Sequence, residues 1–80
     1  MPHRLKVLSG KEVVRIFEKY GCEVLRTVGS HVRIKIDGDS RHITIPLHKE
    51  LKKGTLRGII KDFEISFGAD LADKEFYTTN

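Results

Sequence analysis

A histidine and two basic residues alternate with apolar residues in the stretch HVRIKI, at positions 31–36. Successive side chains of a β-strand point to opposite faces, so His31, Arg33 and Lys35 share one face of the predicted strand. Histidine can move a proton near neutral pH because its ordinary pKa is about 6.5. The two neighbouring cations favour an anionic ligand. The stretch therefore indicates acid–base chemistry on a negatively charged substrate.

The next alternating stretch, RHITI, brings further polar side chains to the same face. It follows the turn sequence Asp-Gly-Asp-Ser. A two-residue loop at positions 38–39 sets His31 opposite Pro46 and Lys35 opposite His42, so that polar residues meet polar residues. Two more polar residues follow just beyond this strand. The predicted open face therefore presents His31, Arg33, Lys35 and His42, with His48 and Lys49 beside it.

Two amphipathic helices are predicted on either side of these strands. Ser9 and Glu12 have capping-box spacing, and an apolar stripe follows until Gly21, which predicts a helix over about 10–20. A second apolar stripe begins after Thr55, which is the expected N-cap. Its members are Leu56, Ile59, Ile60 and Phe63.

The predicted strands are residues 22–28, 31–37 and 41–45, with a tight turn at Gly29 and Ser30. A bulge is expected in the first strand, because simple alternation leaves two valines exposed. The order is α-β-β-β-α, an α+β fold in which two helices cover one face of a three-stranded antiparallel sheet. The tail, about 68–80, is expected to be a short helix or mobile.

The composition indicates one small globular domain over residues 1–80. Apolar residues make up 39% of the chain and charged residues 32%, and the net charge of +4 favours a polyanionic partner, with nucleic acid first. No apolar run approaches the roughly 20 residues of a membrane span. The short basic start lacks the apolar core of a signal peptide, so we expect a cytoplasmic protein with no membrane partner. The single cysteine, Cys22, is expected to be a buried filler.

The residues alone leave simpler interpretations open. An isolated histidine at a strand start is more often an ordinary surface residue than a catalytic one. A zinc site built from His31, His42 and His48 lacks tight ligand spacing, and no carboxylate or thiol on that face completes four ligands. For His48, packing against Pro46 is as good an interpretation as a chemical role. We therefore expect no metal.

Several short motifs resemble the HicA toxins, also called YcfA-like proteins, of bacterial and archaeal toxin–antitoxin modules. The motifs are Ser-Gly-Lys-Glu at 9–12, Tyr-Gly at 20–21, Gly-Ser-His at 29–31, Pro-x-His at 46–48 and Glu-Leu-x-x-Gly-Thr-Leu at 50–56. Each motif is weak alone, but together they span about residues 9–65 in the order of that family. Relatives often carry histidine or an aromatic residue where this chain has Val32, a position that faces the predicted core.

The resemblance implies a fold like the double-stranded RNA-binding domain. It also implies a type II toxin that cleaves messenger RNA until a HicB-like antitoxin covers it. The histidine of Gly-Ser-His, here His31, is then the catalytic acid or base, and no metal or cofactor is needed. His48 is the first candidate for the second group, and His42 is the next. RNA contacts are expected from Gly29, Ser30, Arg33, Lys35, His42, His48 and Lys49.

Two alternatives accompany this interpretation. A non-catalytic RNA-binding module of the same fold is the first, because a fold does not fix a function. The second is an inactive relative that is retained only to bind an antitoxin. It ranks last because the chain keeps His31.

Overall fold

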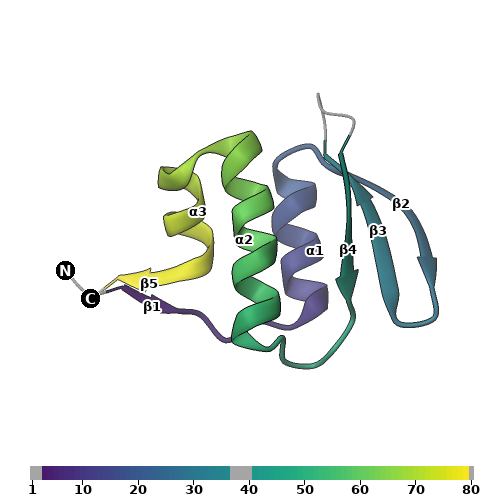
Figure 1. Cartoon of the computed structure of the whole chain (residues 1–80), viewed down its shortest axis with the longest axis horizontal. Coiled ribbons are helices and arrows are strands. Elements are labelled where there is room, and N and C mark those ends of the chain that lie inside the picture. The colour runs from purple at the N-terminus through teal and green to yellow at the C-terminus, as the bar shows by residue number, and fades with distance from the viewer. Residues whose placement is uncertain (1–2, 37–40, 80) are drawn as a thin grey trace.

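The computed structural model describes residues 3–36 and 41–79. A three-stranded antiparallel sheet, in the order β2-β3-β4, carries helices on one face (Figure 1). Its strands are β2 (Glu23–Val28), β3 (His31–Lys35) and β4 (His42–Pro46), and the helices against it are α1 (Gly10–Lys19) and α2 (Lys53–Phe67). The predicted α-β-β-β-α order is confirmed. The predicted turn at 38–39 lies outside the described residues.

Helix α1 begins at the predicted capping box. The Ser9 hydroxyl accepts a hydrogen bond from the Glu12 N–H at 3.1 Å, and the Glu12 carboxylate accepts one from the Ser9 N–H at 2.8 Å. The hydrogen bonds from the backbone and side chain of Ser9 favour the ionised carboxylate and lower the pKa of Glu12. Gly21 follows the helix with a φ of +89°, the left-handed conformation expected of a C′ glycine.

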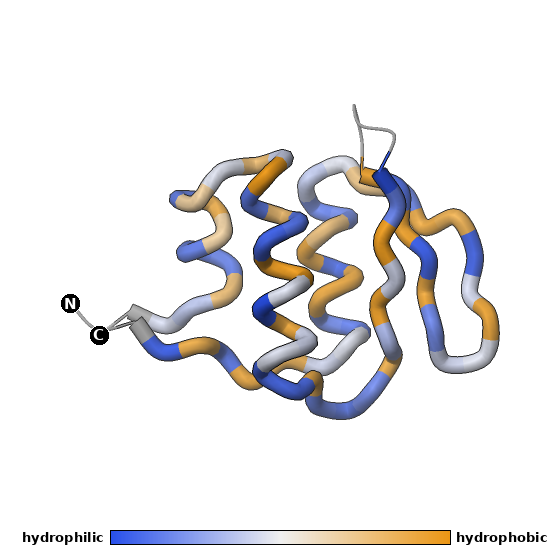
Figure 2. Tube along the Cα trace, viewed as in Figure 1, coloured by the Kyte–Doolittle hydropathy of each residue, from blue (hydrophilic) through white to orange (hydrophobic). Residues whose placement is uncertain are grey.

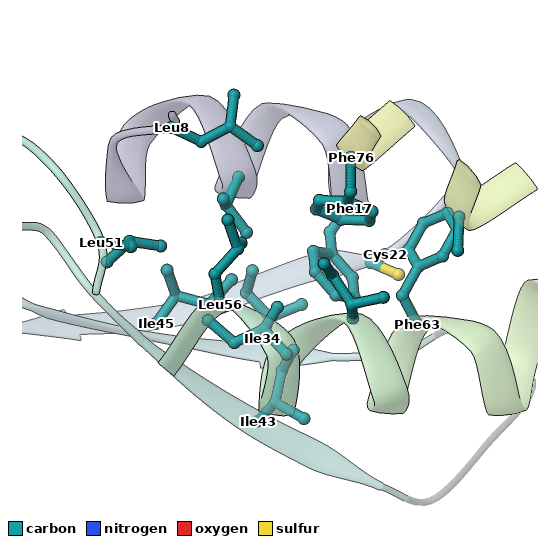
Figure 3. Close-up of a cluster of buried hydrophobic side chains, with 14 of the residues drawn as sticks. Leu8, Phe17, Cys22, Ile34, Ile43, Ile45, Leu51, Leu56, Phe63 and Phe76 are labelled. Atoms are coloured by element: carbon teal, nitrogen blue, oxygen red, sulfur yellow. The ribbon is translucent and has the colours of Figure 1, made fainter. Parts of the chain in front are cut away.

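Hydrophobic and hydrophilic residues alternate along β3 and β4 (Figure 2). Burial follows the same alternation, so the sheet has a buried face and an open face. The buried face carries Val32, Ile34, Ile43 and Ile45, none more than 9% exposed. These side chains pack against the apolar stripes of α1 and α2, and Cys22 joins them as predicted (Figure 3). The core thus turns the polar side chains of both strands toward the open face.

The start of α2 differs from the prediction. Lys53 is the first helical residue, and Lys52 is the N-cap without a side-chain cap hydrogen bond, so the Thr55 cap was wrong. The buried Leu51 donates its N–H to the Leu8 carbonyl at 2.9 Å just before the helix. Tertiary packing of the preceding loop therefore sets the first turn, in place of a local cap.

Arg41 joins the start of β4 to α2. Its guanidinium donates to the Asp62 carboxylate at 3.2 Å, to the Asp62 carbonyl at 2.9 Å and to the Ser66 hydroxyl at 2.8 Å. The Ile36 N–H donates to the Arg41 carbonyl at 3.2 Å, which continues the predicted pairing of these residues. This arginine therefore has a structural role.

Residues 69–79 form a helix and a strand. Helix α3 (Ala69–Phe76) leads into strand β5 (Tyr77–Thr79), which pairs antiparallel with β1 (His3–Leu5). These elements lie on the far side of α2 from the sheet (Figure 1). The short-helix alternative for the tail is thus the observed one, and the β1–β5 pair was not predicted. No helix of residues 3–36 and 41–79 is long and apolar enough to cross a membrane.

Phe63 is the centre of an aromatic cluster that joins α1, α2 and α3. Its ring centroid lies 5.4 Å from that of Phe17, 5.2 Å from that of Tyr20 and 5.2 Å from that of Phe76, in edge-on contacts. Figure 3 shows Phe17, Phe63 and Phe76 in this cluster. Phe67 adds a tilted contact at 4.8 Å. Since Phe76 is fully buried, α3 is part of the core.

Glu75 of α3 accepts hydrogen bonds from two residues at the end of α1. The Tyr20 hydroxyl donates at 2.6 Å and the Lys19 ammonium at 2.9 Å, while Glu75 is only 7% exposed. Burial raises the pKa of Glu75, but the hydrogen bonds from Lys19 and Tyr20 outweigh it and lower the pKa below its usual 4.5. The ionised carboxylate therefore holds α3 against α1.

We expect Glu75→Gln to lower the free energy of unfolding more at neutral pH than in acid. A carboxyl whose folded pKa is lowered stabilises the fold above its ordinary pKa of 4.5 and loses that contribution as the pH falls through the folded value. Urea unfolding of both proteins near neutral pH and at about pH 3 measures the difference. An equal difference at both pH values contradicts this role of Glu75.

Candidate active site

His31 is exposed on the open face, at the first position of β3. The turn before it has a φ of +59° at Gly29 and no positive φ at Ser30, the pattern of a type II′ hairpin turn. The Ser30 carbonyl accepts the N–H of Leu47 at 2.6 Å, so the turn is fastened to the chain beyond β4. The backbone of His31 is therefore held on both sides.

The predicted register between β3 and β4 is confirmed at each described pair. Three of these pairs lie on the open face, namely His31 with Pro46, Arg33 with Thr44 and Lys35 with His42. The alternate pairs put isoleucine and valine side chains into the core. The alternation of polar and apolar residues and the expected loop at 38–39 thus predicted the same register.

The expected bulge in β2 lies between Val24 and Arg26, where the register with β3 shifts. Val24 is half-buried opposite Ile34, and Leu25, which has no partner in the register, is 42% exposed. Beyond the bulge, Arg26 stands opposite Arg33. The bulge thus lets the Val24 side chain pack against the core while the Arg26 side chain lies on the open face.

A shallow hollow of about 200 Å³ opens on this face around the histidine. We call it the His31 hollow, and it is lined by Arg26, Val28, His31, Arg33 and Thr44. All three strands contribute to it, and its members are cross-strand neighbours in adjacent pairs. The hollow therefore combines one imidazole, two guanidinium groups, one hydroxyl and one apolar wall.

Arg26 is the functional candidate that the sequence interpretation missed. Counting back from the Gly29–Ser30 turn sets Val28 opposite His31 and Arg26 opposite Arg33. This count holds whatever the strand does before residue 26. The position of the turn was therefore enough to predict an arginine on the open face. The expected bulge left the faces of the β2 side chains unassigned, so Arg26 was missed.

Lys35 and His42 lie at the other end of the open face. They are a cross-strand pair four residues along β3 from His31, a separation of about 13 Å at the usual rise per residue. Glu23 stands opposite Lys35 on the other side and adds a carboxylate there. Both residues share the face of His31, as predicted, but neither lines the His31 hollow.

His48 and Lys49 line a different hollow, of about 300 Å³, with Ser9, Lys11 and Leu47 at the start of α1. Both side chains are exposed. The His48 carbonyl accepts the N–H of Gly10 at 2.9 Å, which fixes the backbone of this segment. His48 is two residues beyond Pro46, the partner of His31, so the two hollows adjoin the same end of the sheet without sharing a histidine.

Gly10 allows α1 to begin directly against the end of β4. A Cβ at this position would overlap the Pro46 carbonyl oxygen and lie 2.8 Å from the Cα of Leu47. Both are backbone atoms, which cannot move aside as a side chain can. The Ser-Gly-Lys-Glu motif therefore needs its glycine for this close approach, which places the segment that carries His48.

We expect Gly10→Ala to lower the free energy of unfolding by about 1–3 kcal/mol, the usual cost of overpacking. Gly58→Ala is the matched control, because Gly58 lies inside α2 with open space at its Cβ, and alanine there should stabilise the helix by about 0.5–1 kcal/mol. Urea unfolding measures both changes. Equal effects of the two substitutions contradict the close approach.

Within residues 3–36 and 41–79, no three histidine, cysteine, aspartate or glutamate side chains gather as a metal site would require. The chemistry that the described side chains of the His31 hollow can offer is proton transfer by an imidazole and anion binding by two guanidinium groups.

Comparison with known proteins gives one match. A family model described as the HicA toxin of bacterial toxin–antitoxin systems matches residues 10–65. These residues include α1, all three strands of the sheet and most of α2, and they leave out α3 and the β1–β5 pair. No curated protein and no solved structure matches the chain.

Proposed function

We propose a function for this chain, which belongs to the HicA toxin family of bacterial toxin–antitoxin modules. It is an endoribonuclease that cleaves messenger RNA, and His31 is its general base. The observation that carries the proposal is the exposed imidazole of His31 in one hollow with two guanidinium groups. An accessible base beside an anion-binding group is what cleavage of an RNA phosphodiester requires.

The proposed reaction uses the ribose of the substrate as its nucleophile. His31 takes the proton of the 2′-hydroxyl, and the 2′-oxygen attacks the adjacent phosphorus. The bond from phosphorus to the 5′-oxygen then breaks, and a general acid protonates that oxygen. The products are a 2′,3′-cyclic phosphate and a 5′-hydroxyl, and no metal or cofactor takes part.

The general acid is best sought at the turn end of the sheet. His42 lies about 13 Å along the strands from His31, whereas a catalytic group must come within about 3 Å of the atom it serves. His48 follows Pro46, the cross-strand partner of His31, and remains the first candidate. We assign His42, Lys35 and Lys49 to the path of the RNA backbone, with the turn residues Gly29 and Ser30 beside the cleaved nucleotide.

The partner we propose is a HicB-like antitoxin. A toxin of a toxin–antitoxin family is restrained by its antitoxin, and the net charge of +4 favours an acidic segment in that partner. A messenger RNA substrate sets the cytoplasm as the place of action.

Incubation of the purified protein with single-stranded RNA in EDTA tests the function. We expect metal-independent cleavage and products that end in a 2′,3′-cyclic phosphate, identified by mass spectrometry. Intact RNA together with salt-sensitive binding would instead support the non-catalytic RNA-binding module.

A further inference from the structure

We infer that Arg26 and Arg33 together bind the phosphodiester that is cleaved, as a two-arginine clamp beside His31. The inference rests on the proposed function for the identity of its ligand and on the geometry of the open face for its location. It gives a role in the reaction to Arg26, which stands outside the alternating stretch that first indicated the site.

The register of the sheet makes the two arginines direct neighbours. Arg26 and Arg33 are cross-strand partners beyond the β2 bulge, and side chains at opposed positions have Cβ atoms about 4.5–5.5 Å apart. Like charges at directly opposed positions destabilise a sheet. Such a pair is expected where an anion bridges the two charges during function.

No side chain of the described residues neutralises this pair. Within residues 3–36 and 41–79, the side chains of Arg26 and Arg33 make no hydrogen bond or ion pair, and the carboxylate of Glu23 stands opposite Lys35. The contrast is Arg41, whose guanidinium is held by Asp62 and Ser66. Arg41 joins two elements of the fold, whereas the open-face arginines keep their donors available for a ligand.

The His31 hollow fits a small anion. Its volume of about 200 Å³ is below the roughly 300–1,000 Å³ of pockets that enclose drug-sized ligands. A phosphodiester bound there meets two planar guanidinium groups, whose paired N–H donors match phosphate oxygens. The Thr44 hydroxyl, opposite Arg33, adds a donor, and Val28, which is 61% exposed, forms an apolar wall.

The clamp and the histidine line the same hollow. We therefore expect the clamped phosphate to be the one next to the ribose 2′-hydroxyl that His31 deprotonates. Negative charge grows on the non-bridging oxygens of that phosphate as the 2′-oxygen attacks. Donors already aimed at those oxygens stabilise the transition state more than the bound substrate. The clamp should therefore act mainly on kcat and less on KM.

The test compares Arg26→Ala, Arg26→Lys and Arg33→Ala with Arg57→Ala, a matched loss of one exposed arginine from α2. We expect each clamp alanine to lower kcat by about 10²-fold, the effect typical of losing one transition-state donor. Arg26→Lys keeps the charge without the planar fork and should recover only part of the rate. Arg57→Ala should stay within about twofold of the wild type on the same RNA.

Two further measurements separate a loss of the clamp from a loss of folding or of RNA affinity in general. Thermal unfolding should show no loss of Tm in Arg26→Ala, because the change removes a like-charge contact. An RNA whose 2′-hydroxyls are methylated cannot be cleaved. Anisotropy with this RNA should show weaker binding and a shallower salt dependence for the clamp variants than for Arg57→Ala.

An unchanged kcat in Arg26→Ala overturns the clamp at the cleaved phosphate, whether or not binding weakens. If the wild-type protein cleaves no RNA, the proposed function fails. The methylated RNA then still decides whether Arg26 and Arg33 form a phosphate site. Equal binding by the clamp variants and Arg57→Ala rejects that site as well.

Discussion

Replacing His31 with alanine should lower the rate of RNA cleavage by about 10²–10⁴-fold, the usual contribution of one general acid or base. Expression of the wild-type protein in a bacterial host should arrest growth, and the alanine variant should not. His31 is exposed, so the free energy of unfolding should stay within about 0.5 kcal/mol of the wild type. The lower cleavage rate would then reflect the loss of the imidazole and not a loss of folding.

The measurement is single-turnover cleavage of a defined RNA in EDTA, read with thermal unfolding and with the toxicity of each variant. A second variant, His31→Gln, keeps a polar side chain that does not titrate, and it should be as inactive as the alanine variant. Arg57→Ala serves as the exposed control. A folded His31→Ala protein that cleaves RNA at the wild-type rate would remove His31 from the mechanism.

The largest expected loss of stability comes from Phe76→Ala, at about 3–5 kcal/mol. Phe76 is fully buried, and its ring centroid lies 5.2 Å from that of Phe63. A domain of 80 residues has roughly 4–12 kcal/mol of stability in all. Removal of this one side chain of α3 should therefore abolish a large part of the free energy of unfolding.

Urea unfolding of Phe76→Ala measures this loss, and Ile65→Ala is its control. Ile65 is a large apolar residue of α2 that is 71% exposed, so its removal should change the free energy of unfolding by no more than about 0.5 kcal/mol. Similar losses in the two variants would show that α3 is a dispensable appendage and that Phe76 does not belong to the core.

The central fold followed from the sequence because several local rules agreed. The Ser9–Glu12 capping box, the Gly29–Ser30 turn and the alternation along residues 31–36 each have a short-range cause, and all three are present in the structure. The register of β3 and β4 followed as well, since a shift by one residue would bury Arg33 and expose Ile34. The part of the open face formed by β3 and β4 was therefore predictable from local patterns alone, whereas Arg26 in β2 was missed.

Other features depend on contacts between distant segments, and sequence patterns carry little information about those. Strands β1 and β5 have three residues each, too few for a periodic pattern, and they pair only because α3 folds back along α2. The start of α2 follows the packing of Leu51 and not a cap at Thr55. The separation of His31 and His48 into two hollows likewise depends on where α1 begins.

The pairing of β1 with β5 also has a consequence in time. Residue 3 cannot meet residue 79 until the ribosome has made the last strand, and Phe76 reaches the core only just before. At about five to twenty residues per second, the β2–β3 hairpin that carries His31 is synthesised some seconds before the fold that supports it can close. A nascent chain of this toxin family member thus carries its histidine before it has a complete core.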